Sequence, residues 1–336
     1  MKHLAFILLF FAADLPAKWG DLSSTVLIEP GYDSNPALLT VEEREMFEGC
    51  HPDFIRLESY NDSYLRAGCE INYRFRLGKI RAETGLLYRY THYFFNREKS
   101  YHYIKTGIEL RRKKWRGEFS FTLIPEYASR LYRDTDEPDE PYFWSTFSTT
   151  RFAISGRYEA ISNHWVAIET EYETDRYNDH FPEYDGTGYK VGPVWRWTGP
   201  IYVKFGYAYR VYDARGYDTE AESKLDSDKS DISYVEDRLE TYVSRDFGDF
   251  TVGFSSDLSR RYYTSEKPFT DDYIHIARRD LRADIEPFIR LEATRKLELT
   301  LSCAITIRDS DSPYYDLDPI KDYNRARFSV RAEYEI

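Results

Sequence analysis

The chain has no apolar run long enough to cross a bilayer as a helix, and it has little cysteine or methionine. Its 336 residues include three Cys and two Met. The main apolar stretch is segment 4–13, which is too short to span hydrocarbon as a helix. The odd number of cysteines, with Cys69 and Cys303 in the middle of expected strands, argues against a disulfide framework. No linker, low-complexity tract or shift in composition divides the chain, so we predict one domain after a short leader.

No pattern typical of a catalytic or cofactor site is present. The sequence contains no nucleophile elbow, no pair of zinc ligands and no glycine-rich phosphate loop. His92, His102, His180 and His275 are near predicted loops, and Asp179 precedes His180. A histidine in a polar loop is most often a surface residue, so we assign no catalytic residue, metal or cofactor and expect a protein that is not an enzyme. A hydrolase carried on these loops stays as an alternative.

The N-terminus has the organisation of a secretory signal peptide. A short basic region at residues 1–3 precedes the apolar segment 4–13, and cleavage is expected after Ala17. We therefore predict a signal peptide at residues 1–17 and an exported domain at residues 18–336.

Strict alternation of apolar and polar residues dominates the rest of the chain. In residues 65–77 one parity reads Leu, Ala, Cys, Ile, Tyr, Phe, Leu, and the other reads Arg, Gly, Glu, Asn, Arg, Arg. Successive side chains of a strand point to opposite faces, so this segment has one apolar and one charged face. Together with the leader, the repeated pattern predicts an all-β protein, a transmembrane antiparallel up-and-down β-barrel in the bacterial outer membrane. A soluble β-sandwich or β-helix is the alternative.

Short turns alternate with long polar connections along the chain. Outer-membrane barrels have short periplasmic turns and long external loops, so the count predicts about fourteen strands, with twelve and sixteen as alternatives, and places both termini in the periplasm. The six short turns are at residues 77–79, 115–117, 162–164, 198–200, 247–249 and 295–297. The seven long loops are at about 33–62, 94–101, 131–142, 175–186, 213–231, 263–276 and 309–322.

The parity of each strand predicts which residues face lipid, and the neighbouring connections predict two aromatic belts. The lipid-facing residues are Ile80, Ala82, Leu86 and Tyr88; Phe119, Phe121, Leu123 and Tyr127; Ile201, Val203, Phe205, Tyr207 and Tyr209; Leu281, Ala283, Ile285, Ile289 and Leu291; and Leu297, Leu299, Leu301, Cys303, Ile305 and Ile307. The periplasmic belt is Trp115, Trp165, Trp195 and Trp197. The outer belt is Tyr90, Tyr93, Phe94, Phe95, Tyr132, Tyr177, Tyr212, Tyr262 and Tyr263.

The opposite parity is rich in charge of both signs and predicts a polar, water-filled lumen. If an arginine-rich wall of the second to fourth strands faces the glutamates of the seventh, a transverse field would orient dipolar solutes; cross-strand salt-bridge ladders are the alternative. The loop at about 33–62 is the candidate for folding inward as a constriction. The predicted pore-lining residues are Arg66, Glu70, Arg74, Arg76, Arg81, Glu83, Arg89, Lys105, Glu109, Arg111, Glu169, Glu171, Glu173, Arg282, Arg290, Arg327 and Arg331.

The predicted loops are acidic, and the net charge of −12 argues against nucleic acid as a partner. Carboxylates can bind divalent cations that also bridge lipopolysaccharide, although their spacing matches no metal-binding loop, and a solvated repulsive surface is the alternative. Expected partners are outer-membrane lipid and lipopolysaccharide, the barrel assembly machinery during biogenesis and small solutes, with a homo-oligomer left open. The acidic residues are Asp134, Asp136, Glu137, Asp139, Glu140, Asp309, Asp311, Asp316, Asp318 and Asp322.

Residues 29–36 read Glu-Pro-Gly-Tyr-Asp-Ser-Asn-Pro. The segment resembles the first-strand signature of a family of outer-membrane β-barrel porins and of related barrels near polysaccharide-export genes. It is less similar to the start of the barrel in surface lipoprotein assembly modifiers, whose N-terminal helical-repeat domain this chain lacks. The alternation from Phe328 to Ile336 resembles the terminal signal read by the assembly machinery, although that signal usually ends in an aromatic residue.

The resemblance implies a passive or substrate-selective channel. We therefore expect an outer-membrane porin, monomeric or trimeric, that passes small hydrophilic solutes or a charged glycan. The first alternative is a closed structural or partner-binding barrel, and the second is the loop-borne hydrolase.

Overall fold

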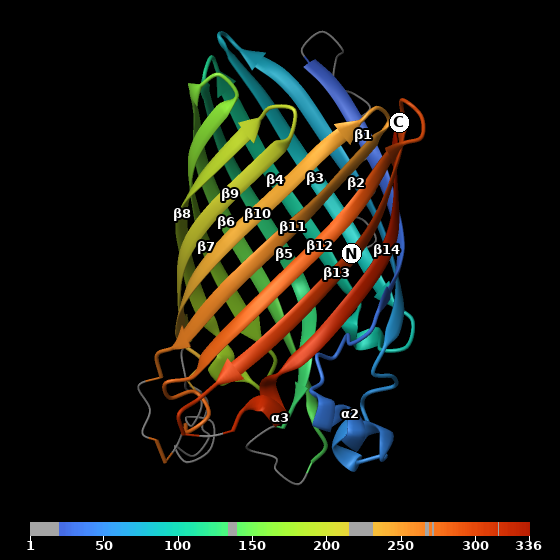
Figure 1. Cartoon of the computed structure of the whole chain (residues 1–336), viewed down its shortest axis with the longest axis vertical. Helices are drawn as coiled ribbons and strands as arrows, with labels where there is room; N and C mark the ends of the chain where they lie inside the picture. Colours follow the sequence, from blue (N-terminus) through green and yellow to red (C-terminus); the bar gives the residue numbers. More distant parts are fainter. Residues whose placement is uncertain (1–19, 134–139, 215–230, 266–268, 271, 315) are drawn as a thin grey trace.

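The computed structural model describes residues 20–133, 140–214, 231–265, 269–270, 272–314 and 316–336, so the predicted signal peptide lies outside the described residues. The described chain forms one closed antiparallel barrel in which each strand pairs with its neighbours in sequence (Figure 1). The prediction of fourteen strands is confirmed. The strands are β1 (Gly20–Asp33), β2 (Asp62–Leu77), β3 (Ile80–Tyr93), β4 (Tyr101–Arg112), β5 (Trp115–Tyr132), β6 (Phe143–Ile161), β7 (His164–Tyr177), β8 (Gly186–Thr198), β9 (Tyr202–Ala214), β10 (Tyr234–Phe247), β11 (Phe250–Tyr263), β12 (Arg279–Glu292), β13 (Leu297–Asp311) and β14 (Tyr323–Glu335).

The connections differ in length at the two ends of the barrel. Six short turns join the strands at one end, which we call the turn end, and β1 begins and β14 finishes there. The long connections lie at the opposite loop end, where the helices are found (Figure 1). These helices are α2 (Val41–Glu48), α3 (Asp318–Lys321) and the 3-10 turns η1 (Pro52–Phe54), η2 (Arg97–Lys99) and η3 (Pro182–Tyr184). No helix among the described residues is long and apolar enough to cross a membrane.

Polar side chains fasten β1 to β14 where the barrel closes. Arg325 of β14 forms an ion pair with Asp33, the last residue of β1, and Asp33 is fully buried. Asn35 donates from its amide to the carbonyl oxygens of Leu39 and Asn324. Two polar residues of the Gly-Tyr-Asp-Ser-Asn-Pro segment therefore join the first strand to the last.

The outer surface of the barrel is apolar, as expected from strand parity. Ile154, Ile168 and Leu301 expose more than half of their surface, at 58%, 55% and 55% respectively. Patches of this kind on a folded protein indicate contact with lipid or with another protein.

Two sets of aromatic residues depart from the predicted belts. Trp165 lies on the same parity of β7 as Glu169, and the guanidinium carbon of Arg116 is 4.4 Å from its ring centroid. The prediction of Trp165 as a lipid-facing belt residue is therefore wrong. Proximity to a turn predicts the depth of a residue in the membrane, but only parity predicts its face.

The same correction applies at the loop end. Tyr93 and Tyr212 are 5% and 3% exposed, Tyr177 stacks on Phe147 inside the barrel, and Tyr263 donates to Asp280. These four tyrosines face the interior and do not belong to the outer belt, and the same holds for Tyr132, whose ring contacts Phe181 and Tyr184. In contrast, Phe94 and Phe95 are exposed, as predicted.

Irregularities in β5 change the face of a further residue. The pairing of β5 with β6 shifts between Ile124 and Tyr127. As a result Tyr127 packs edge-on against Tyr101 and Phe147 instead of continuing the lipid-facing parity of Phe119–Leu123. The prediction that Tyr127 faces lipid is wrong for this reason.

Candidate functional site: the interior of the barrel

The interior contains open spaces lined mainly by charged and hydroxyl side chains. One of them has a volume of about 880 Å3, and its lining includes Arg238, Asp257 and Arg282. A second space of about 330 Å3 is lined by residues of β4–β9. Arg196 and Lys204 line both spaces, so the two adjoin. An interior of this kind can hold water and polar solutes.

Arg66 and Arg331, both predicted to line the pore, converge on one buried carboxylate. Each guanidinium is 2.7 Å from an oxygen of Glu29, which is 2% exposed. The hydroxyl of Tyr64 also donates to Glu29. Glu29 is not among the residues that the sequence predicts to line the pore, and the pairing of β1 with β2 places it opposite Arg66.

The predicted residues of β2–β4 form a second network. Arg74 is 3.1 Å from Glu83, and Arg111 contacts both Glu83 and Glu109. Carboxylates and guanidinium groups on neighbouring strands thus neutralise one another across the sheet.

The three glutamates of β7 are also neutralised by their neighbours. Glu169 lies 3.0 Å from Arg196, and Glu171 lies 3.3 Å from Lys190. Glu173 is paired with Arg151 and Arg210. In a ring of fourteen strands β3 lies opposite β10, so β7 is not the wall that faces β2–β4. The arrangement of these three glutamates corresponds to cross-strand ion-pair ladders and not to an unneutralised acidic wall opposite the arginines.

The remaining predicted residues are distributed around the barrel. Arg282 pairs with Asp284 at 2.7 Å, and Arg290 pairs with Glu298 at 3.1 Å. Glu70 accepts a hydrogen bond from Asn72, and Arg89 lies opposite Gly68 and Tyr103 in the pairing register. The others line interior spaces: Lys105 and Arg327 the two described above, and Arg76 and Arg81 a third of about 780 Å3 at the turn end.

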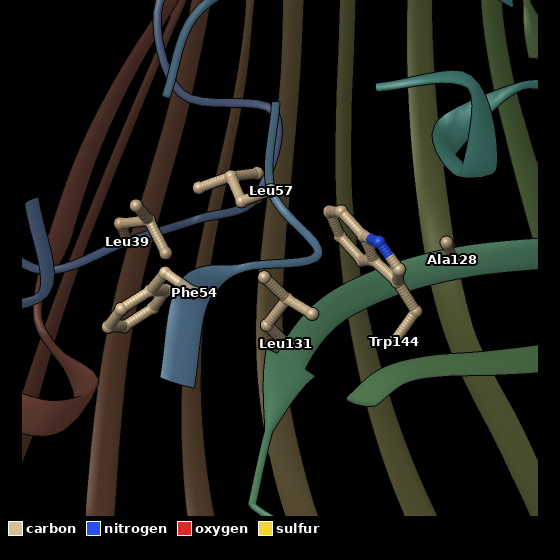
Figure 2. Packing of buried hydrophobic residues seen from close by; sticks show 7 residues of the cluster. Leu39, Phe54, Leu57, Ala128, Leu131 and Trp144 are labelled. Atoms are coloured by element: carbon tan, nitrogen blue, oxygen red, sulfur yellow. The ribbon is translucent and has the colours of Figure 1, made fainter. Parts of the chain in front are cut away.

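The first loop, residues 34–61, packs onto the inner wall at the loop end. Figure 2 shows Leu39, Phe54 and Leu57 of this loop gathered against Leu131 of β5 and Trp144 of β6. Helix α2 begins with a capping box, in which Thr40 accepts from the backbone of Glu43 and the Glu43 carboxylate accepts from the backbone of Thr40. The sequence singles out this loop as the candidate for folding inward, and the apolar cluster holds it against β5 and β6.

Helix α3 reaches the same region from the last loop. The Lys321 ammonium is 4.7 Å from the ring centroid of Tyr132 on β5, and the Thr40 hydroxyl donates to the carbonyl oxygen of Pro319 at 2.5 Å. Tyr132 also meets Phe181 and Tyr184 of the loop between β7 and β8. Three loops from different sides of the barrel therefore meet at its loop end.

Lys99 of η2 is a buried cation without a carboxylate partner in the described part of the chain. It is fully buried, and its ammonium donates to the carbonyl oxygens of Ala128 and, at 2.9 Å, Ser129. The ammonium also lies 4.8 Å from the Tyr127 ring. Burial lowers the pKa of Lys99 to about 7. Nothing in the local sequence distinguishes this lysine, because its burial depends on the bulged segment of β5.

A buried Asp–His pair joins two further loops. His275 Nδ1 lies 2.7 Å from Asp272, which also accepts hydrogen bonds from the hydroxyl of Ser265 and the backbone of Asp231. Burial lowers the pKa of His275 despite the neighbouring carboxylate.

The other loop histidines pack against aromatic rings. His180 stacks on Phe143, and His92 and His102 stack on Tyr90. Four of the predicted acidic loop residues, Asp134, Asp136, Glu137 and Asp139, lie outside the described residues. Within the described ranges, no group of three or more His, Cys, Asp or Glu side chains is placed to hold a metal ion.

Comparison with known proteins finds similarity in structure only. No family model and no curated protein matches the sequence. A structure titled bacterial polysaccharide outer membrane secretin is similar over 93% of this chain and 98% of its own, at 10% identity and a TM-score of 0.48. Pseudomonas aeruginosa OpdK with vanillate is similar over 94% and 99% of the two chains, at 7% identity and a TM-score of 0.42. Acinetobacter baumannii OccAB3 is similar over 94% and 100%, at 7% identity and a TM-score of 0.42.

Proposed function

We propose that the protein is a channel of the bacterial outer membrane, exported by its N-terminal signal peptide, that passes small hydrophilic or charged solutes through its interior. The observation that carries the proposal is the division of the closed sheet into two faces. Its exterior exposes large apolar side chains, while its interior holds ion-paired charged residues around a space of about 880 Å3. An apolar exterior suits hydrocarbon, and a polar, hollow interior suits water.

The predicted pore-lining residues are part of this proposal. Outer-membrane lipid and lipopolysaccharide would surround the apolar exterior, and the assembly machinery would read the last strand. We propose no enzymatic activity. Besides small solutes, the charged interior favours a charged glycan as a larger solute.

A closed barrel that binds a partner through its loops is the second candidate. It is supported by the contacts at the loop end, where Lys321 reaches Tyr132 and Glu43 reaches Arg130. Loops fastened in this way would restrict passage unless they move.

Recording in planar bilayers tests both candidates. A channel is expected to give discrete conductance steps, with a reversal potential in a salt gradient that reports its ion preference. Protein that inserts in the folded state but carries no current, at any voltage the membrane withstands, would exclude the channel and leave the closed barrel.

A further inference from the structure

Five arginines of β2–β6 form one continuous row at the turn end. The pairing register sets each of them directly opposite the next. All five lie on the interior parity of their strands. In strand order they are Arg76, Arg81, Arg111, Arg116 and Arg157.

A row of like charges is unfavourable unless other groups compensate it. The next inward row supplies three carboxylates, those of Glu83, Glu109 and Glu118, again paired one to the next. Each of these carboxylates forms an ion pair with an arginine. Arg74 lies 3.1 Å from Glu83, Arg111 contacts Glu109, and Arg157 lies 2.5 Å from Glu118.

Three arginines of the row form no ion pair with these carboxylates. Arg76, Arg81 and Arg116 have no carboxylate partner among the residues that the structure describes. Arg116 stacks on Trp165, which fixes the plane of its guanidinium without neutralising it. Arg76 and Arg81 line the open space of about 780 Å3, together with Arg74, Arg111 and the carboxylates of Asp21 and Glu83. The guanidinium groups of Arg76 and Arg81 are thus accessible from this space and have no carboxylate partner among the described residues.

We propose that this arginine row binds a linear polyanion at the turn end of the barrel. Four interstrand spacings of about 4.8 Å place its ends about 19 Å apart along the wall, so a single small anion would engage only part of it. A guanidinium group binds carboxylates and phosphates through two parallel hydrogen bonds. A chain with an anionic group on each repeat, such as an acidic oligosaccharide, matches both the chemistry and the extended shape of the row.

The distribution of charge between the two ends of the barrel favours approach of a polyanion from the turn end. Helix α2 at the loop end carries Glu42, Glu45 and Glu48 besides Arg44 and the paired Glu43, whereas the turns next to the row carry Lys79, Lys113 and Lys114. A polyanion is therefore attracted at the turn end and repelled at the loop end. The assignment of the periplasm as its source rests on the proposed outer-membrane orientation, but binding itself does not.

The test measures binding to the folded protein in detergent by calorimetry, with oligogalacturonate as the probe. Low salt is used because exposed charges are screened. We expect binding that weakens as salt is raised, and weakening by about tenfold in the triple variant Arg76→Gln/Arg81→Gln/Arg116→Gln. The matched control, Arg245→Gln/Arg295→Gln/Lys296→Gln, removes three cations from the same end of the barrel outside the row, and we expect it to bind as the parent does.

Further probes separate the possible sources of binding. Tripolyphosphate tests whether a phosphate chain is accepted in place of carboxylates. Monomeric galacturonate and a neutral malto-oligosaccharide are expected to bind far more weakly. The proposal is overturned if the parent does not bind either polyanion at low salt. It is also overturned if the neutral or monomeric probe binds as tightly as oligogalacturonate, or if the row and control variants lose equal affinity.

Two controls keep the result interpretable. A folded barrel resists dodecyl sulfate until it is heated, so a difference in gel mobility between heated and unheated samples shows whether each variant has folded. If the triple variant does not fold, Arg81→Gln alone replaces it. Since binding is measured without a membrane, a protein that binds but does not conduct would contradict the channel and leave the polyanion site intact. A protein that conducts but does not bind the polyanion would contradict the polyanion site and leave the channel intact.

Discussion

The guanidinium of Arg130 on β5 and the carboxylate of Glu43 on α2 form an ion pair at 2.5 Å, although the two residues are 87 positions apart in the chain. The Arg130 side chain is 3% exposed, so the first loop places its carboxylate where an interior cation needs it. This contact, together with the apolar cluster in Figure 2, holds the first loop against the inner wall.

Glu43→Gln is expected to release the first loop from the loop end. Removing one partner of a buried ion pair costs about 3 kcal/mol, because the remaining charge loses that ion pair. We expect larger or more frequent conductance steps in planar bilayers than for the parent. Glu42→Gln removes the same charge from the neighbouring position on α2 and should leave the recordings unchanged; equal effects of the two variants would show that the ion pair does not hold the loop.

Leu131→Ala tests the apolar contact of the same loop. Leu131 is 1% exposed, and truncating a buried leucine costs about 2–5 kcal/mol. Because the cavity lies under the first loop, we expect faster cleavage by protease within residues 41–58 while the barrel stays intact. Val41→Ala is the control, since Val41 is 71% exposed. Unchanged cleavage of the Leu131 variant would mean that other contacts suffice to seat the loop.

Lys99 is expected to make stability depend on pH above neutrality. Its pKa is lowered from 10.5 to about 7 in the folded protein, so between these values the unfolded chain binds a proton that the folded protein does not. The free energy of unfolding should therefore rise with pH from about 7 to 10.5. Urea unfolding of the parent and of Lys99→Met across this range provides the measurement. The variant should show a smaller rise than the parent, because burial also lowers the pKa of Lys321, which remains in both proteins. Parallel pH profiles would contradict the assignment.

Leu301→Lys tests whether the apolar exterior lies in hydrocarbon. Leu301 is the fifth of the fifteen residues of β13 and is 55% exposed. Lysine on the lipid-facing side is expected to destabilise the barrel by up to about 2–4 kcal/mol, the cost at the bilayer midplane, measured by urea unfolding in liposomes. Leu301→Met keeps the position apolar and should have little effect. A lysine tolerated as well as methionine would argue that this face meets water.

Much of the fold follows from local pattern. Each hairpin repeats the two-residue period, and Gly78 and Gly248, both with positive φ, mark turns that the sequence also predicts. The interior positions of Arg66 and Arg331 follow from the same parity. Their shared partner Glu29 could have been found only by pairing β1 with both of its neighbours, because the barrel is closed by strands that are distant in sequence.

The aromatic residues near the strand ends show where local pattern is insufficient. The sequence predicts that both Tyr93 and Tyr127 face lipid. Tyr93 lies beside a predicted loop, and Tyr127 lies on the apolar parity of its strand. Tyr93 instead donates to Asp33 of β1, and a register shift turns Tyr127 inward. The orientation of Tyr93 depends on β1, a strand that does not precede β3 directly in sequence, and the orientation of Tyr127 depends on a bulge.

The sequence alone determined the two-faced strands and the polarity of the interior, and it predicted about fourteen strands, since alternation and turn residues act over only a few positions. The tertiary structure decided which charges meet, because strand register sets Arg76 opposite Arg81 and leaves both without a carboxylate among the described residues. It also decided that the first and last loops meet over Tyr132 at the loop end. Contacts between distant segments depend on closing the sheet into a ring, and no local pattern in the chain encodes that geometry.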